Sequence, residues 1–350
     1  MKLRKVYLSV FVGCGLLLIS ACSSDSGGET GTGIKDKTII GPITSTATAS
    51  INVNGINFST DNANIVFDDV ETTQDQLAVG MIVTVNGKVN SDAVSGAAEN
   101  IVAETEVKGS VFSTAINQDG VGELVVMGRT VTVTANTKFK SRVAGITLAD
   151  IDTQTVVQVS GYSDNAGNIR ATFLKVTDIN GDAGEIKVKG VIAELELPNK
   201  QFKIDQFTVV FDDDTKFSDV EKEDLQDGLF VKVESEKYDS MNNTLQIIAS
   251  KIKLDGNDEQ HGDEVEAKGL VINVDNLGAV DSADGEFGIS KGRLIRVDAN
   301  TRYKDGDKSN IVLDALLEVE GKVAEDGAIV AKEIEFQDER DDEPDDEEDD

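Results

Sequence analysis

The sequence predicts an all-β protein made of tandem small OB-like β-barrel repeats, and three observations lead to this expectation. The chain has 32 glycines and only 3 prolines beside many Val, Ile and Thr residues, a composition typical of strands joined by tight turns. After residue 34, apolar and polar residues alternate with the period of two that marks a sheet with one buried face. The same short blocks return along the chain, which indicates a repeat architecture.

The first block of a repeat is a short strand that carries a glycine. The copies are Val107–Val111, Val188–Ile192 and Ala267–Val271. The second block is a strand followed by a polar turn and a Thr-Lys/Arg-aromatic triplet. Its copies are Val131–Phe139, Val209–Phe217 and Ile295–Tyr303. Both blocks predict strands, because their residues alternate and turn-forming residues flank them.

The third block is a strand that usually ends in glycine and is followed by a return strand. The first strands are Ile82–Gly87, Val156–Gly161, Leu316–Gly321 and Phe230–Glu234, the last followed by Ser235 instead of glycine. The return strands are Ile101–Glu104, Ile169–Val176, Ile247–Leu254 and Ile329–Phe336. Helical segments are expected to be short, at Thr147–Ile151 and Asp219–Leu225.

About five or six strands in each repeat can bury one face by curling into a small barrel, and closure also removes exposed sheet edges. An elongated stack of sheets is the alternative. We expect repeat 1 at 39–106, repeat 2 at 107–178, repeat 3 at 184–255 and repeat 4 at 264–336. The Asp/Gly-rich stretches between the later repeats are typical of linkers.

The order of these blocks resembles the bacterial domain-of-unknown-function family 5666, which occurs as tandem repeats in predicted lipoproteins. Repeat 1 carries the nearest match, in Val53–Ile65 and Leu77–Gly87. The resemblance covers roughly residues 40 to 336. It implies OB-like barrels and brings no established activity and no catalytic residues. Repeat 3 departs most, since Ser235 replaces the glycine at the strand end and its turn is acidic.

The N-terminus predicts a secreted, lipid-anchored protein. Lys2, Arg4 and Lys5 precede an apolar run of about fourteen residues, which is too short to span a membrane and suits a signal peptide. The run ends in Ile19-Ser20-Ala21-Cys22, which resembles a lipobox, so we expect a signal peptide at 1–21 and lipidation of Cys22. Residues 22–38 would form a flexible tether.

The expected location is the bacterial cell envelope. In Gram-negative lipoproteins an Asp after the cysteine favours the inner membrane; here the residue is Ser23, which favours the outer membrane. Cys14 would leave with the signal peptide, so the mature chain has no free thiol and no disulfide. Whether the protein faces the periplasm or the cell surface is left open.

Charge and composition exclude some classes of partner. The formal charge is −32, and loss of the three basic residues before Cys22 makes the mature chain about −35, so a nucleic-acid partner is not expected. Trp is absent and aromatic residues make up 5% of the chain, so a carbohydrate groove gains no support. Residues 337–350 are almost entirely acidic and predict a disordered, solubilising tail that could attract cations or a basic partner.

Three acidic groups are weak candidates for a calcium site, and each also has the composition of an ordinary polar turn. They are Asp212, Asp213 and Asp214; Asp178, Asn180 and Asp182; and Asp281, Asp284 and Glu286. His261, the single histidine, has no second His or Cys with which to complete a transition-metal site. No residues are singled out as a catalytic constellation.

The sequence therefore predicts a non-enzymatic envelope lipoprotein that acts as a binding or scaffold module. The membrane is reached through a lipid anchor, and the partner would be an envelope protein or a surface polymer. No cofactor is expected. One alternative is calcium-dependent binding through Asp212, Asp213, Asp214 and the tail. Another is an envelope hydrolase, which requires a concave carboxylate pair inside one barrel.

Overall fold

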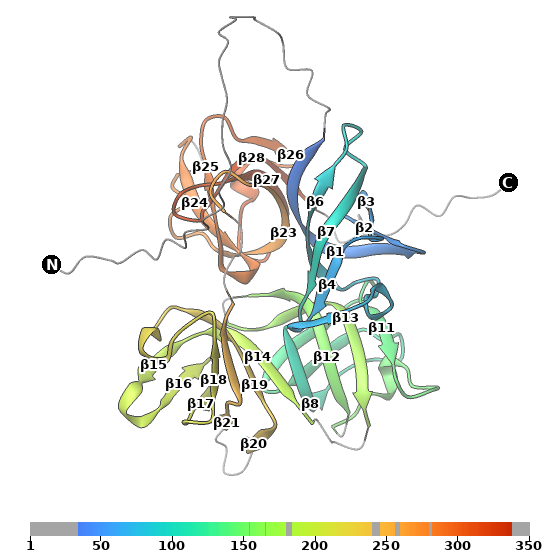
Figure 1. Cartoon of the computed structure of the whole chain (residues 1–350), viewed down its shortest axis with the longest axis vertical. Coiled ribbons are helices and arrows are strands. Elements are labelled where there is room, and N and C mark those ends of the chain that lie inside the picture. Colours follow the sequence, from blue (N-terminus) through green and yellow to red (C-terminus); the bar gives the residue numbers. More distant parts are fainter. Residues whose placement is uncertain are drawn as a thin grey trace, which may run out of the picture. The chain divides into compact units, whose positions relative to one another are not determined.

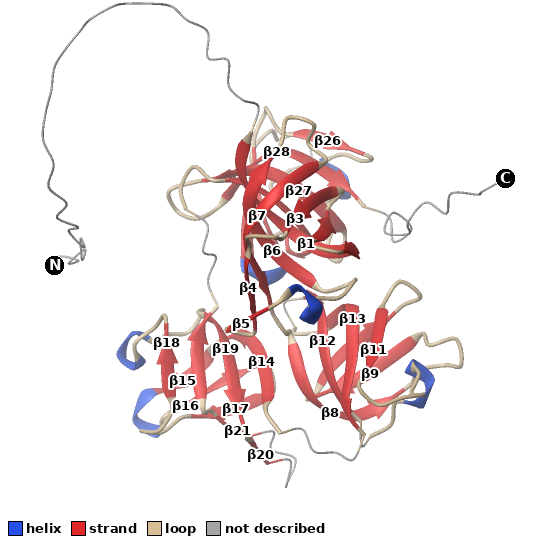
Figure 2. Cartoon of the chain, turned by 45° about the vertical axis from the view of Figure 1, so that its right-hand side comes forward, coloured by secondary structure: helices blue, strands red, loops and turns tan. Residues whose placement is uncertain are grey.

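The computed structural model describes residues 34–153, 155–164, 166–179, 184–239, 246–255, 260–279 and 282–337. These residues form strands joined by turns and single-turn 3₁₀ helices, which confirms the all-β class (Figure 1, Figure 2). The predicted signal peptide, Cys22 and the acidic tail after Gln337 lie outside the described residues. Within the described ranges, no helix has the length and apolarity required to span a membrane.

Repeat 2 is a closed barrel with OB-like strand order (Figure 1). Its strands are β8 (Val107–Thr114), β9 (Gly122–Val126), β10 (Arg129–Val133), β11 (Lys138–Ser141), β12 (Val156–Ser163) and β13 (Ile169–Asp178). Strands β8, β9 and β10 pair antiparallel in order, and β10 runs parallel to β13. Strand β13 forms a hairpin with β12, which returns to β8 and closes the ring. Strand β11 lies parallel to β13 outside the ring.

Repeats 1 and 4 close in the same way. The strands of repeat 1 are β1 (Lys35–Ala47), β2 (Ser50–Val53), β3 (Ile56–Ser59), β4 (Asn64–Phe67), β5 (Val70–Thr72), β6 (Ile82–Val89) and β7 (Ser95–Ala103). Those of repeat 4 are β23 (Glu264–Asn273), β24 (Gly285–Ile289), β25 (Arg293–Val297), β26 (Arg302–Lys304), β27 (Leu316–Val323) and β28 (Ile329–Phe336). The rings run β1-β2-β3-β7-β6 and β23-β24-β25-β28-β27, so the elongated stack is wrong for these repeats.

Repeat 3 is split between two sheets. Its strands are β14 (Ile186–Val191), β15 (Ala193–Glu196), β16 (Gln201–Ile204), β17 (Phe207–Val210), β18 (Lys216–Ser218), β19 (Phe230–Ser235), β20 (Lys237–Asp239), β21 (Gln246–Ile248) and β22 (Lys251–Leu254). Strands β14, β19, β22 and β18 belong to one sheet, and β15, β16, β17, β21 and β20 form the other. The long hairpin of the other repeats is thus cut into β19/β22 and β20/β21.

The strand-end glycine accounts for this difference. In the closed barrels the ladder shifts register at Gly87, Gly161 and Gly321, where a β-bulge lets the strand bend around the barrel. An added Cβ at each glycine would lie 2.3 Å from a carbonyl oxygen of the return strand, so a side chain does not fit. Repeat 3 has Ser235 at this place, fully buried, and its hydroxyl donates to the carbonyl of Ile248. The ladder ends there.

The threonine of the second block is explained by two hydrogen bonds. Thr137, Thr215 and Thr301 each donate their hydroxyl to an alanine carbonyl of the return strand, over 2.7, 2.8 and 2.9 Å. The same oxygen accepts from a backbone N–H three residues earlier. The threonine therefore closes the polar turn and joins it to the next strand of the same barrel.

The helices are single 3₁₀ turns. They are η1 (Gln74–Gln76), η2 (Leu148–Asp150), η3 (Leu197–Asn199), η4 (Lys222–Asp224), η6 (Ser290–Gly292) and η7 (Lys308–Asn310). The expected helical segments at Thr147–Ile151 and Asp219–Leu225 correspond to η2 and η4. A capping box holds η2, since the Asp150 carboxylate accepts from both the backbone N–H and the hydroxyl of Thr147.

A residue with left-handed backbone conformation lies in one hairpin turn of every repeat, between β2 and β3, β9 and β10, β16 and β17, and β24 and β25. These turn residues are Asn54, Met127, Asp205 and Lys291, with φ of 49°, 48°, 49° and 66°. Such turns match the twist of paired strands. Asn54 hydrogen-bonds Glu266 of repeat 4, Met127 packs beside Ile186 of repeat 3, and Asp205 pairs with Arg129 of repeat 2 at 2.5 Å.

Sheet pairing joins the repeats in two pairs. Strand β1 runs parallel to β23, with Thr38–Ile40 opposite Val265–Ala267, and β8 pairs with β14 through Lys108 and Val107. Repeats 2 and 3 accordingly share one buried apolar cluster. Strand β1 begins at Lys35, so strand structure starts before residue 39, and the last residues of the predicted tether 22–38 belong to the sheet. The segment is a strand because β1 pairs with β6 and β23. The Lys/Asp-rich sequence of the segment did not indicate this strand.

Candidate functional site

A cleft with a volume of about 730 Å³ draws its walls from repeats 1, 3 and 4. Repeat 1 contributes residues of β1, β6 and β7, repeat 3 the end of β22, and repeat 4 the turn around η6. The side chains are mostly charged or polar. The cleft exists only because the repeats pack together, so no single barrel contains it.

An acidic turn of repeat 1 forms part of the network below this cleft. Strands β4 and β5 make a hairpin whose central residues, Asp68 and Asp69, have φ of 51° and 67°. Aspartate tolerates this left-handed conformation better than most residues. The Asp69 carboxylate pairs with the ammonium groups of Lys232, Lys251 and Lys253 at 2.8, 2.7 and 2.7 Å.

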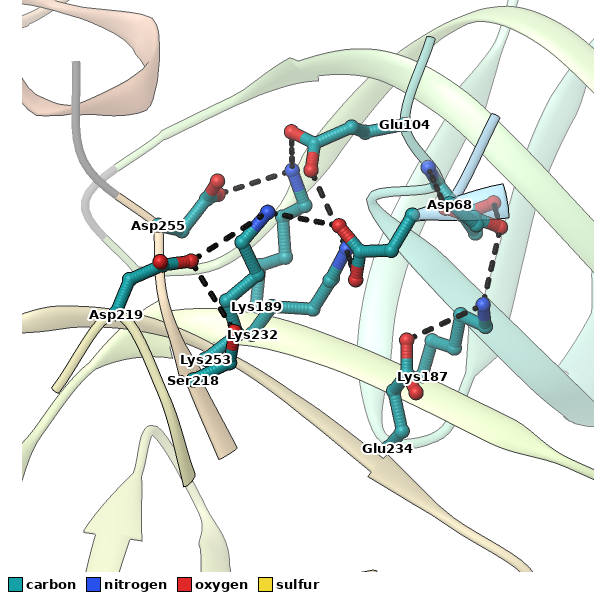
Figure 3. Close-up of polar contacts among 12 residues, drawn as sticks. Asp68, Glu104, Lys187, Lys189, Ser218, Asp219, Lys232, Glu234, Lys253 and Asp255 are labelled. Carbon is teal, nitrogen blue, oxygen red and sulfur yellow. Dashed lines mark hydrogen bonds and ion pairs between the residues drawn. The ribbon is translucent and has the colours of Figure 1, made fainter. Parts of the chain in front are cut away.

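The lysines come from one face of repeat 3. Lys187 and Lys189 alternate along β14, and Lys251 and Lys253 along β22, so the intervening Val188 and Ile252 point into the core. Lys232 on β19 lies between these strands. Figure 3 shows Lys187, Lys189, Lys232 and Lys253 directed toward the acidic side chains of repeat 1. We call this group, with Asp68, Asp69 and Glu104, the lysine–acid network.

Lys189 is the most buried cation of the network. Its side chain has no exposed surface, and its ammonium lies 2.6 Å from Glu104 and 2.9 Å from Asp255 (Figure 3). Burial alone would lower the pKa of Lys189, but the carboxylates of Glu104, Asp255 and Glu106 outweigh it and raise the pKa. The network therefore keeps its ions charged, and removal of one partner would leave an uncompensated charge.

The pKa values of the carboxylates in the network shift in the opposite direction and are lowered. Burial would raise the pKa of Asp69, but hydrogen bonds from Lys232, Lys251 and Lys253 lower it well below its usual range. Burial likewise opposes ionisation of Glu104, and the charges of Lys189, Lys291 and Lys232 overcome it and lower the pKa. Both groups are ionised at neutral pH, which makes the contact between repeats 1 and 3 electrostatic.

Lys291 differs from the other cations around the cleft. Lys37 pairs with Glu266 and Glu320, and Lys253 with Asp69. The half-buried Lys291 makes no side-chain hydrogen bond or ion pair with any described residue. Burial and the charge of Lys189 lower its pKa, although Glu106 and Glu104 attract it from a distance. An amine of this kind is suited to receive an anionic group of a ligand.

A second cleft, of about 420 Å³, lies between repeats 1 and 4 and holds a carboxyl pair. Glu266 on β23 and Glu318 on β27 are hydrogen-bonded to each other. Burial and the neighbouring charge of Glu266 raise the pKa of Glu318 from 4.5 to about 8. Burial raises the pKa of Glu266 as well, against the attraction of Lys37. The pair therefore retains a proton at neutral pH.

This pair does not have the geometry of a glycosidase. Two catalytic carboxyl groups are separated by about 5 Å or more so that a sugar fits between them, whereas Glu266 and Glu318 bond directly. They also lie on the outer face of the barrel. The inward positions of the described barrels are filled by apolar side chains such as Val265, Leu317 and Ile334.

The sequence-predicted calcium ligands are used for other contacts. Asp212 accepts from the backbone N–H groups of Asp214 and Thr215 at 2.9 and 3.1 Å, which makes it a turn residue. Asp213 pairs with Lys200 at 2.5 Å. Among the described residues, no three His, Cys, Asp or Glu side chains are placed to hold a metal ion.

The other two acidic groups lie partly outside the described residues, which exclude Asn180, Asp182 and Asp281. Asp178 ends β13. Glu286 pairs with Arg296 at 2.7 Å. The carbonyl of Asp284, with those of Ser282 and Ala279, accepts from the ammonium of Lys308 over 3.1, 2.8 and 3.3 Å. The ammonium of Lys308 thus binds the backbone carbonyl groups of this turn. His261 contacts the Val323 carbonyl through Nδ1 at 3.2 Å.

The residues of the 730 Å³ cleft and of the lysine–acid network were not found from the sequence. The alternation of Lys187 with Lys189, and of Lys251 with Lys253, is a usable signal, because it places four cations on one face of an otherwise acidic chain. Their partners, Asp69 and Glu104, lie more than a hundred positions away from some of them. Nothing in a period-two pattern specifies such a partner.

The closed rings of repeats 1, 2 and 4 define a class of protein: an all-β chain of tandem OB-like barrels. Comparison with known families identifies it further, since the family described as "Domain of unknown function (DUF5666)" matches residues 40–101, 108–175, 189–253 and 277–335. The chain belongs to this family and carries four copies of its domain, as the sequence resemblance predicted.

No curated protein matches the chain. Among solved structures, the chain is similar to one described as drosophila Unr CSD456, with 14% identity over 66% of this chain and 97% of that chain. The TM-score is 0.16.

Proposed function

We propose that this chain is a non-catalytic binding protein of the bacterial cell envelope, anchored through lipidated Cys22, with its ligand site in the 730 Å³ cleft. The observation that carries the proposal is the half-buried, unpaired ammonium of Lys291 in a cleft whose walls come from three repeats. The volume lies within the usual range for ligand sites, and the charged and polar lining suits a polar ligand.

The way the repeats pack determines how repetition contributes to binding. Separate barrels on flexible linkers would multiply weak contacts through effective concentration. Here β1–β23 and β8–β14 pairing and the lysine–acid network join the repeats. Repeats 1, 3 and 4 therefore build one composite site, and the ligand, an envelope protein or the end of a surface polymer, meets all of its walls together.

The cleft is tested by photo-crosslinking in living cells of the native organism. A photoreactive residue replaces Glu99, an exposed residue of the cleft wall, or, as a matched control, the exposed Glu194 of β15. The proposal expects a discrete adduct from position 99 that position 194 does not give. The same adducts from both positions, or none from position 99, would contradict it.

The anchor is tested separately with Cys22→Ser. The wild-type chain is expected in the outer-membrane fraction and the variant in the soluble envelope fraction, because several buried acyl chains together give stable attachment. A variant that stays with the membrane would show that another feature holds it there.

A further inference from the structure

A row of cations crosses the outer face of repeat 2. Strand register places Lys140 of β11 opposite Lys175 of β13, Lys175 opposite Gln158 of β12, and Gln158 opposite Lys108 of β8. Neighbouring strands are about 4.8 Å apart, so these side chains form a line across the sheet. We call Lys108, Lys140, Lys175 and the adjacent Arg142 the basic row.

The basic row lacks the carboxylates that neutralise lysines elsewhere in this protein. Lys108 meets Glu185 at 3.7 Å. The side chains of Lys140, Arg142 and Lys175 make no hydrogen bond or ion pair with the part of the chain that the structure describes. Asp75 of repeat 1 attracts Lys140 only from a distance.

Lys175 is the most buried cation of the basic row. Its side chain is only 7% exposed. Burial, followed by the like charges of Arg142, Lys140 and Lys108, lowers its pKa. Four cations held together on a chain with 65 acidic and 33 basic residues raise the electrostatic energy, unless an anion from outside the described residues compensates them.

The chain itself contains a polyanion of suitable length. Residues 338–350 hold eleven acidic side chains and one arginine. The described chain ends at Gln337, whose N–H donates to the carbonyl of Leu316 over 3.0 Å. Leu316 lines a cavity of about 170 Å³ together with Lys138, which lies two residues before Lys140 on β11. Thirteen residues can extend over roughly 40 Å, so the tail begins within reach of the basic row.

We infer that the acidic tail, residues 338–350, docks on the basic row of repeat 2 within the same molecule. Charge complementarity, the position of Gln337 and the length of the tail support this occupant. Docking would neutralise the row and shield it from external anionic polymers, which would have to displace a tethered competitor. The contact is electrostatic and therefore sensitive to ionic strength.

Carbodiimide coupling of the full chain tests the inference, since it joins lysine amines to carboxylates in direct contact. Mass spectrometry is expected to find the tail coupled to Lys140 or Lys175 at low salt, and this coupling should fall about tenfold at 1 M salt, where the Debye length is about 3 Å. The exposed pair Lys200–Asp213 serves as an internal positive control. Lys140→Glu with Arg142→Glu should abolish the tail adducts and leave the control adduct.

Two further measurements test the docking, one on a truncated chain and one on a mixture of isotope-labelled and unlabelled chains. In a chain that stops after Gln337, acetylation of Lys140 should rise severalfold while that of Lys200 stays constant, and this result does not depend on the charge-reversal variant folding. Mixing isotope-labelled and unlabelled chains shows whether the adducts are intramolecular. Adducts between a labelled and an unlabelled chain would show that the tail of a second copy occupies the basic row, and would overturn docking within one molecule. Tail adducts spread evenly over lysines, or unchanged Lys140 reactivity, would overturn the docking.

Discussion

The charged side chains of this protein make its folding stability depend on pH in two opposite ways. Asp69 and Glu104 have lowered pKa values in the folded chain, so their stabilising contribution is present above the usual carboxyl pKa and is lost as the pH falls. Glu318 has a raised pKa, so its contribution is complete below 4.5 and is lost as the pH rises toward 8. Stability is therefore limited at low pH by the contact between repeats 1 and 3, and at high pH by the carboxyl pair of repeat 4.

Replacing Glu318 with Gln should remove the loss on the alkaline side. Gln imitates the protonated carboxyl and avoids a buried charge beside Glu266. We expect the melting temperature of Glu318→Gln to exceed that of the wild type at pH 9 and to match it closely at pH 5. Calorimetry at both pH values measures this, with the exposed Glu194→Gln as control. A difference that does not change with pH would contradict the assignment.

Replacing Lys189 with Met should be strongly destabilising. The substitution leaves Glu104 and Asp255 without their buried partner, and such a loss costs about 3–5 kcal/mol. Lys200→Met, on the surface, should change the free energy of unfolding by less than about 0.5 kcal/mol. Urea unfolding compares the two. If both variants unfold like the wild type, the lysine–acid network does not hold repeats 1 and 3 together.

Among the elements, the strand-end glycine decides whether a repeat closes into one ring. Gly87, Gly161 and Gly321 allow the bulge, and Ser235 ends the ladder. Sequence reading recognised this substitution as the main departure of repeat 3. It could not predict the consequence, because the steric conflict arises with a carbonyl on the partner strand, nine or ten residues away.

Gly161→Ser should destabilise repeat 2. The added Cβ would lie 2.3 Å from the carbonyl oxygen of Arg170 and 2.8 Å from the side chain of Ile169, and overpacking of this kind costs about 1–3 kcal/mol. Gly269→Ala is the matched control, since its nearest atom is 3.3 Å away. Chemical unfolding should show a larger loss of stability for Gly161→Ser than for Gly269→Ala. Equal effects would mean that the glycine is not needed for the bulge.

Sequence patterns predicted the elements far better than the contacts between repeats. Alternation located the strands, and the recurring Thr137, Thr215 and Thr301 marked equivalent turns. The same alternation predicts that outward-facing side chains are exposed to solvent. Every residue of β12 is nevertheless buried, because its outward Gln158 and Ser160 contact repeat 1. Local periodicity contains no information about which second barrel covers a face, so the cleft could not be predicted.

At the scale of the whole molecule, the repeats depend on one another for covered sheet edges and apolar surface. Ile40 and Ile82 of repeat 1 and Tyr162 of repeat 2 belong to the apolar cluster of repeat 4. Repeats 2 and 3 share another buried apolar cluster. Folding of any one repeat therefore contributes to the burial of its neighbours.

Truncation after Asp255, which removes repeat 4 and the tail, should lower the melting temperature and cause self-association. The chain loses β23 as the neighbour of β1 and exposes Ile40, Ile82 and Tyr162, and an unpaired edge beside apolar surface promotes aggregation. Truncation after Gln337 is the control. A monomeric, equally stable product from the first truncation would show that repeats fold independently.

The left-handed residue in this hairpin turn of each repeat makes the order of the repeats matter. One backbone position carries an amide in Asn54, a thioether in Met127, a carboxylate in Asp205 and an amine in Lys291. Because the first three already contact a specific neighbour, the four copies are no longer interchangeable. A gene rearranged to exchange two copies would keep every barrel sequence and lose the matching junctions. The contacts between neighbouring copies therefore fix the order of the copies along the chain.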